Sequence, residues 1–123
     1  MTSPSESDKP SQGDVWLTAL GAGRVGEPAK TRPTVVVSAD WLPADSVYDL
    51  LFVVPLSSSL PPATLRPRLL PTPSTGLQKP SVAIPRAMRG VSRTRLLKRL
   101  GRVDDDTMDE IGHVLAALLG LPL

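Results

Sequence analysis

The 123-residue sequence has no cysteine, a single histidine and only four aromatic residues. Without cysteine, the chain has neither a disulfide scaffold nor a thiolate metal site. His113 alone excludes any nuclease mechanism that requires two histidines. With so few aromatic rings, the chain is not expected to stack many nucleic-acid bases on its surface. The aromatic residues are Trp16, Trp41, Tyr48 and Phe52.

Long apolar segments are also missing from the sequence. No apolar run is long enough to span a membrane, and the first residues lack the apolar region of a secretion signal. A cytoplasmic protein is therefore expected. Residues 1–12 are polar and rich in serine and proline, which predicts a disordered tail. The remaining residues, 13–123, are expected to form one compact domain.

Acidic residues are absent from the middle of the chain, between Asp49 and Asp104. Residues 1–49 hold seven acids and four bases, and residues 104–123 hold five acids and no lysine or arginine. Such segregation creates a local positive field, whose simplest use is to hold a phosphate backbone. The alternative is an ordinary solvated face, although ordinary surfaces intersperse the two signs. The middle contains ten bases: Arg66, Arg68, Lys79, Arg86, Arg89, Arg93, Arg95, Lys98, Arg99 and Arg102.

Runs of apolar and β-branched residues predict short strands over most of the chain. Residues 86–96 are expected to form a loop or a short helical turn. Residues 97–103 fit either a strand or a helix, and we favour the strand. The other expected strands are residues 15–19, 34–38, 50–55 and 82–84, with a weaker edge strand in residues 64–71.

One helix is predicted, over residues 106–119. The aspartates at 104–106 supply an N-cap and favourable charge at the helix start, although three carboxylates could also bind a cation. Helical spacing puts four apolar residues on one face: Met108, Ile111, Leu115 and Leu118. The expected fold class is mainly β (α+β), a small curved sheet or barrel with a C-terminal helix.

Two polar residues at strand ends form the candidate site. Arg32 stands directly before the strand at 34–38, and Ser57 directly follows the strand at 50–55. If these strands are antiparallel neighbours, Arg32 and Ser57 meet at one rim of the sheet. Glu27, in the glycine-rich loop before Arg32, can approach the same rim. A guanidinium binds two phosphate oxygens at once but stays protonated, so Arg32 suits charge stabilisation and not the role of a base.

The order of these segments resembles that of the MazF/PemK-type toxins, which are endoribonucleases of bacterial type II toxin–antitoxin pairs. The resemblance covers residues 13–121. The segments that carry it are Gly13-Asp14-Val15-Trp16, residues 26–38 with Arg32-Pro33 before a valine strand, residues 54–58, residues 76–83, residues 95–103 and the C-terminal helix.

The resemblance implies an SH3-like barrel that acts as a homodimer. It implies sequence-specific cleavage of single-stranded RNA as an mRNA interferase, without a metal or another cofactor. Arg32 and Ser57 take the positions of the family's catalytic pair, and Glu27 is a candidate for a catalytic or loop-positioning role. Products with a 2′,3′-cyclic phosphate and a 5′-hydroxyl are implied, as is inhibition by a MazE-like antitoxin that covers the RNA groove.

Four further residues are candidates for RNA binding: Lys30, Ser58, Arg86 and Arg89. The sequence departs from the family pattern at three places. Ser57 replaces a threonine, Pro28 replaces a glutamine after Glu27, and Pro85-Arg86 replaces an Asp-Gln pair. Base recognition is therefore expected to differ from that of relatives.

Two other functions compete with this interpretation. A non-enzymatic toxin of the same fold that poisons DNA gyrase would depend on its C-terminal residues, but the end of this chain, residues 120–123, lacks an aromatic tip. A passive RNA-binding module would bind RNA in a salt-dependent way without cutting it.

Overall fold

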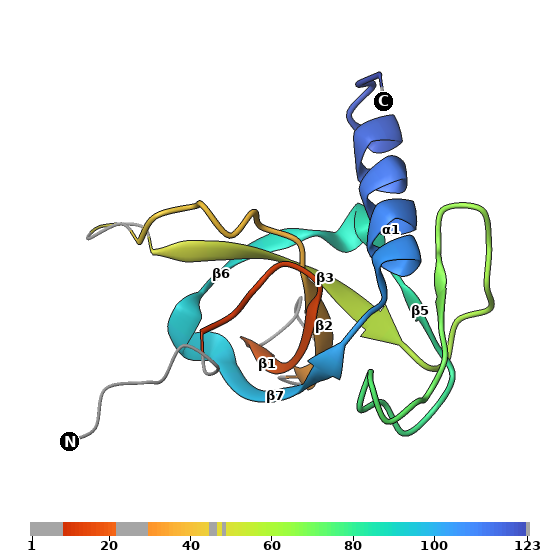
Figure 1. Cartoon of the computed structure of the whole chain (residues 1–123), viewed down its shortest axis with the longest axis horizontal. Coiled ribbons are helices and arrows are strands. Elements are labelled where there is room, and N and C mark those ends of the chain that lie inside the picture. The colour runs from red at the N-terminus through yellow and green to blue at the C-terminus, as the bar shows by residue number, and fades with distance from the viewer. Residues whose placement is uncertain (1–8, 22–29, 45–46, 48, 123) are drawn as a thin grey trace.

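The computed structural model describes residues 9–21, 30–44, 47 and 49–122. It shows a curled antiparallel sheet with a single C-terminal helix (Figure 1). The expected mainly β class is confirmed. The elements are β1 (Asp14–Gly21), β2 (Lys30–Val36), β3 (Leu50–Ser57), β4 (Arg68–Leu69), β5 (Ser81–Ala83), the 3₁₀ helix η2 (Pro85–Ala87), β6 (Arg89–Ser92), the 3₁₀ helix η3 (Arg93–Arg95), β7 (Leu96–Arg102) and α1 (Asp105–Leu118).

The sheet has the strand order β4-β5-β3-β2-β1-β7, with β6 paired to β3. One edge of β3 pairs with β2, and the other edge is shared by two strands. Its first half pairs with β6 and its end pairs with β5. Strong twist and this shared edge curl the sheet into a half-barrel.

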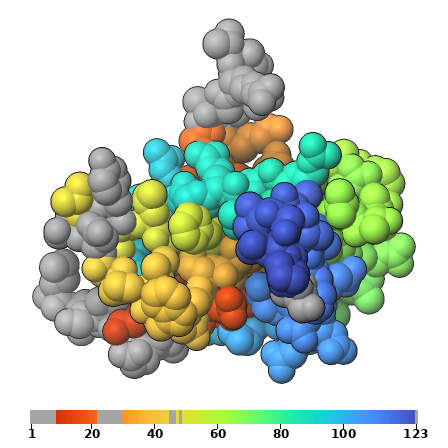
Figure 2. Space-filling view, turned by 90° about the horizontal axis from the view of Figure 1, so that it is seen from above, coloured from red at the N-terminus to blue at the C-terminus, as the bar shows by residue number. Residues whose placement is uncertain are grey.

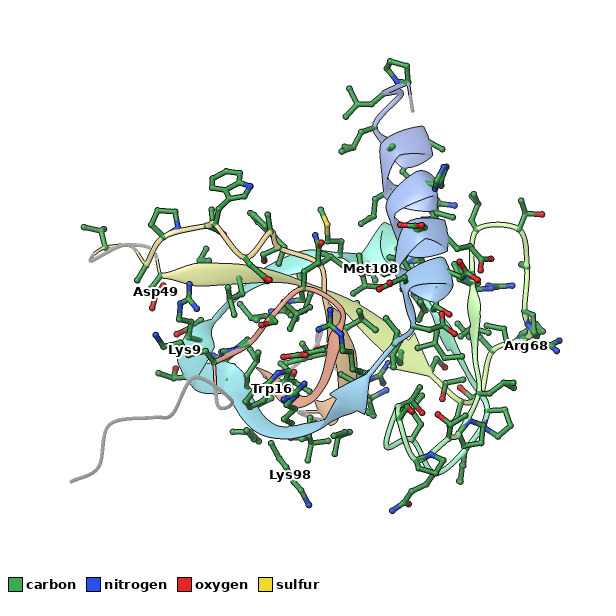
Figure 3. The ribbon with its side chains drawn as sticks, viewed as in Figure 1. Lys9, Trp16, Asp49, Arg68, Lys98 and Met108 are labelled. Atoms are coloured by element: carbon green, nitrogen blue, oxygen red, sulfur yellow. The ribbon has the colours of Figure 1, made fainter. Side chains whose placement is uncertain are left out.

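Both faces of the central strands are buried, which explains their unbroken apolar runs. Val35 and Val54 belong to one apolar cluster, which also contains Ile111 of α1. Their neighbours Val36 and Val53 point the other way, into a second cluster around Trp16. Trp16 lies in the hollow of the curled sheet (Figure 3). Successive residues of one strand thus serve two cores.

Helix α1 begins as the sequence predicts. The Asp104 carboxylate accepts a 2.7 Å hydrogen bond from the Thr107 backbone N–H. Hydrogen bonding from the Thr107 side chain, and then from this backbone N–H, lowers the pKa of Asp104. The predicted apolar face is only partly right. Ile111 and Val114 are buried, whereas Leu118 is 39% exposed. Val114 lies one turn after Ile111 on the side of the helix that faces the core. The C-terminal end of α1, which includes Leu118, extends beyond the sheet (Figure 1).

Several expected element boundaries were wrong. Residues 89–92 form a strand, β6, where a loop or turn was expected, and β4 is far shorter than the expected edge strand. The strand preference for residues 97–103 is confirmed by β7. Gln12, assigned to the tail, donates a 3.0 Å hydrogen bond from its side-chain amide to Val37 O. Residues 1–8 lie outside the described residues, so the tail prediction is untested there.

Among the described residues, no helix has the length and apolar character needed to cross a membrane.

Candidate nucleic-acid interface

Arg32 and Ser57 lie at the same end of two neighbouring strands. Strands β2 and β3 are antiparallel, with Thr34 opposite Pro55. The paired residues end there, and Arg32 and Ser57 each lie two residues further along their strands, at the same end of the pair. Arg32 lies inside β2 and not before it, and Ser57 is the last residue of β3 and not the first residue beyond it. Both residues line the same cleft.

The cleft has a volume of about 700 Å³, which is within the range of small-molecule sites. Apart from the amide of Gln78, its polar side chains are cationic or hydroxylic, and none of the described lining residues is acidic. The cations are Lys30, Arg32, Lys79 and Lys98, and the hydroxyls belong to Thr31, Ser57, Ser58, Ser59 and Ser81. Lys98 projects outward from β7 (Figure 3). Such a surface attracts phosphate groups.

A serine turn fixes the Ser57 hydroxyl. Ser57 Oγ accepts a 3.2 Å hydrogen bond from the Ser59 backbone N–H, and the two serine Oγ atoms lie 3.1 Å apart. When Ser59 Oγ is the donor in that contact, the Ser57 proton is available to a phosphate oxygen. Among the described residues, Arg32 forms no ion pair within 4.0 Å, so no described carboxylate neutralises its guanidinium.

Three arginines of the basic middle pair with aspartates. Arg99 and Arg102 each place a guanidinium nitrogen 3.2 Å from Asp14 Oδ1, and the Asp14 side chain is only 1% exposed. Arg93 Nε lies 2.7 Å from Asp49 Oδ1. Arg99 and Arg102 stabilise the framework, because the buried Asp14 carboxylate requires compensation. The Arg93–Asp49 pair is more exposed and contributes less.

Two predicted RNA-binding residues lie outside the cleft. Arg89 donates a 3.1 Å hydrogen bond to the carbonyl oxygen of Leu20, and Arg86 is exposed on η2, which packs against α1. Their RNA-binding roles stay predictions. Lys30 and Ser58 do line the cleft. Glu27 lies outside the described residues.

Sequence reasoning missed part of the cleft. Lys79 and Lys98 were counted only as members of the basic run, and Gln78 was not considered. These residues come from the turn before β5 and from β7, far from Arg32 in sequence. Their positions depend on how the turn packs, and no local pattern shows that.

The turn from β4 to β5 packs directly on β7. A Cβ on Gly101 would lie 2.2 Å from Ser74 O, and one on Gly76 would lie 2.0 Å from Leu100 O. Gly76 also has a φ of 69°, which favours glycine. In addition, the Arg102 backbone N–H donates a 2.7 Å hydrogen bond to Ser74 O. The turn therefore connects β4 and β5, at one end of the sheet, to β7, at the other end.

Comparison with known proteins supports the family resemblance. The family model described as PemK-like, MazF-like toxin of type II toxin-antitoxin system matches residues 11–119. Endoribonuclease MazF9 of Mycobacterium tuberculosis is 30% identical over 113 residues, which cover 89% of this chain and 96% of the relative. A probable endoribonuclease MazF of Mycolicibacterium smegmatis is 31% identical over 111 residues, which cover 89% and 96% respectively.

Solved structures share the fold at lower identity. The crystal structure of MazF from Deinococcus radiodurans has a TM-score of 0.72 at 22% identity and covers 91% of this chain and 97% of that one. An endoribonuclease in complex with its cognate antitoxin, from a mycobacterial species, has a TM-score of 0.70 at 24% identity, with coverage of 94% and 99%. The half-barrel with one helix is thus a toxin fold. The chain belongs to the PemK-like, MazF-like toxins of type II toxin–antitoxin systems.

Proposed function

We propose that this toxin is a sequence-specific endoribonuclease, an mRNA interferase that cuts single-stranded RNA without a metal or another cofactor. The observation that carries the proposal is the placement of Arg32 and Ser57 in one cationic cleft by neighbouring strands. The relatives from M. tuberculosis and M. smegmatis, which are named endoribonucleases, support it.

RNA binding follows from the charge of the cleft. Lys30, Lys79 and Lys98 attract the phosphate backbone of any sequence, so they contribute affinity that falls with salt. The lining includes no aromatic ring among the described residues, so base stacking on the protein contributes little there. A single strand bends its backbone into such a cleft more easily than a duplex does.

Cleavage proceeds by attack of the RNA 2′-hydroxyl on its own phosphate. The 2′-oxygen–phosphorus bond forms and the bond from phosphorus to the 5′-oxygen breaks, which leaves a 2′,3′-cyclic phosphate and a 5′-hydroxyl. Arg32 stabilises the charge that develops on the phosphate oxygens and can supply a proton to the 5′-oxygen. Ser57 orients the phosphate through its hydroxyl proton.

A base must accept the proton of the 2′-hydroxyl. The described residues that line the cleft include no carboxylate and no histidine. Glu27 is the candidate from the sequence, either as this base or as a residue that positions the loop before Arg32. Water is the alternative acceptor.

An antitoxin partner is the second part of the proposal. One structural neighbour was solved in complex with its cognate antitoxin. For this chain we propose a MazE-like antitoxin with an acidic segment that covers the cationic cleft, because opposite charge favours that pairing. The gyrase alternative has no comparable support, since the relatives are named endoribonucleases.

The proposed assembly is a cytoplasmic homodimer. Figure 2 looks onto a face where α1, the η2–β6 region, the middle of β3 and the segment after β2 lie beside one another. Several large apolar side chains of these segments are exposed, and Trp41 is exposed to 79%. Patches of this kind mark interfaces, and we assign this one to a second copy of the chain. Light scattering of the purified protein gives the mass that tests it. The other exposed residues are Leu50, Phe52, Met88, Leu118, Leu119 and Leu121.

The experiment uses the purified toxin, a long single-stranded RNA of defined sequence and excess EDTA. Wild-type protein is expected to cut at a small set of sites. Arg32→Ala should lower the cleavage rate roughly 100- to 1,000-fold, by analogy with the loss of one preorganised oxyanion donor. Its thermal unfolding should be unchanged, because Arg32 forms no ion pair among the described residues.

Arg68→Ala is the matched control, since Arg68 is exposed on β4, away from the cleft (Figure 3). It should cut at the wild-type rate. Cleavage by Arg32→Ala at the wild-type rate in EDTA would refute the proposed mechanism. Trapping of DNA gyrase without damage to RNA would reverse the ranking of the two functions.

A further inference from the structure

The cleft contains one side chain suited to reading a base. Its lysines and arginine hold phosphates of any sequence, and serine hydroxyls bond to many partners with little discrimination. Gln78 differs, because its amide both donates and accepts in a fixed plane. Among the described residues that line the cleft, Gln78 is the only one with a side-chain amide.

The backbone at Gln78 is firmly placed. Leu77, directly before it, is buried in the apolar cluster that includes Ile111. Gly76, one residue earlier, is locked against the Leu100 carbonyl of β7. Gln78 itself is exposed and lines the cleft, so its side chain is accessible to a ligand there while its backbone is held in place. A reading residue needs this combination, because recognition fails when the supporting backbone is loose.

We propose that Gln78 is the specificity-determining residue of the cleft and that it recognises an adenine next to the cleaved phosphate. This inference rests on the proposed nuclease function. The amide carbonyl accepts from the adenine N6 amino group while the amide N–H donates to N7, the bidentate pairing that glutamine makes with adenine. Unpaired bases in single-stranded RNA expose that edge.

The experiment maps every cut on a long defined single-stranded RNA for wild type, Gln78→Ala and Gln78→Glu. Wild type is expected to require adenine at one position of the motif. Gln78→Ala should lower the ratio of rates at adenine and non-adenine sites by about 5- to 150-fold, the value of one bidentate pair. Gln78→Glu, which can only accept, should shift the preference toward cytosine, whose N4 amino group donates.

Gln12→Ala is the matched control, because Gln12 is the other glutamine of the chain and lies outside the cleft. It should keep the wild-type motif. The ratio between sites separates reading from folding, since a destabilised protein loses rate equally at all sites. Thermal unfolding of each variant accompanies the assay.

Two results would overturn the assignment of Gln78. One is a wild-type motif without adenine, and the other is an unchanged motif in both Gln78 variants while cleavage continues. A wild-type protein that cuts no RNA would instead defeat the proposed function and this inference with it. The outcomes therefore distinguish the two failures.

Discussion

Two groups among the basic side chains of this toxin have opposite surroundings. Arg93, Arg99 and Arg102 contact aspartates, two of them through the buried Asp14. Lys30, Arg32, Lys79 and Lys98 line a cleft that has no acid among its described residues. Lys98 and Arg99 are adjacent in β7, yet alternation along the strand sends them to different environments. A charge count by itself therefore does not identify a nucleic-acid surface.

The comparison predicts that the framework group controls stability. Arg99→Ala combined with Arg102→Ala leaves the Asp14 carboxylate buried without its guanidinium partners. Asp14 keeps its bonds from Ser11 N and Trp16 Nε1, and the two arginines are 40% and 50% exposed, so the expected loss of unfolding free energy is about 1–3 kcal/mol, the cost of a buried polar group that lacks a partner. Urea unfolding measures this loss, and the cut motif of the protein that stays folded should not change.

The matched control for this change is Arg68→Ala with Arg86→Ala, which removes the same charge from two exposed residues. Its unfolding free energy should lie within about 0.5 kcal/mol of wild type. An equal loss in both double variants would show that net charge, and not the Asp14 pair, determines stability.

The cleft group should behave in the opposite way. Lys79→Ala with Lys98→Ala is expected to weaken RNA binding and leave unfolding unchanged. The slope of log affinity against log salt should become shallower by about 0.7 for each lysine that holds a phosphate. Fluorescence anisotropy with a 2′-O-methyl RNA, which lacks the attacking hydroxyl and cannot be cut, measures both quantities.

The Arg68 and Arg86 double variant is also the control for this experiment, because it removes two positive charges, as the lysine double variant does. An unchanged slope in this variant would confine the RNA to the cleft. A slope that falls as far as in the lysine variant would assign RNA contacts to Arg86 as well.

The smallest effect on stability is expected from Asp104 at the start of α1, because its carboxylate is exposed. Hydrogen bonding from Thr107 to the Asp104 carboxylate holds the folded-state pKa of Asp104 below its ordinary value. The resulting stabilisation is complete above the unfolded-state pKa and disappears as pH falls through the lower folded value. Asp104→Ala should lower the melting temperature slightly at neutral pH and show less of this acid-dependent loss.

Asp104→Asn keeps an oxygen that accepts from Thr107 but does not titrate, so it separates the hydrogen bond from the charge. Asp109→Ala, which removes an exposed carboxylate inside the helix, is the control. Identical acid profiles for wild type and Asp104→Asn would contradict a role for this carboxylate.

Local signals in the sequence were enough for most of the fold. Valine runs in β2 and β3, the aspartates before α1 and the apolar spacing of Met108 and Ile111 each act over a few residues. Strand β6 was not predicted from the sequence, because Arg89-Gly90-Val91-Ser92 has little β-propensity of its own. Its pairing with β3 creates the strand, and Leu50 and Phe52 cover Gly90 from the neighbouring strand.

The sequence by itself determined the mainly β class and the C-terminal helix, because hydrophobic period and helix capping are local properties. It placed Arg32 and Ser57 at the ends of two strands, but the pairing of those strands came from the structure. Only the tertiary structure decided which bases meet Asp14, which lysines line the cleft, and that Gln78 stands beside them. Those outcomes depend on register and on the close packing of Gly76 and Gly101 against backbone from distant segments. Contacts between distant segments produce no periodic pattern in the sequence, because the three-dimensional path of the backbone decides which residues meet.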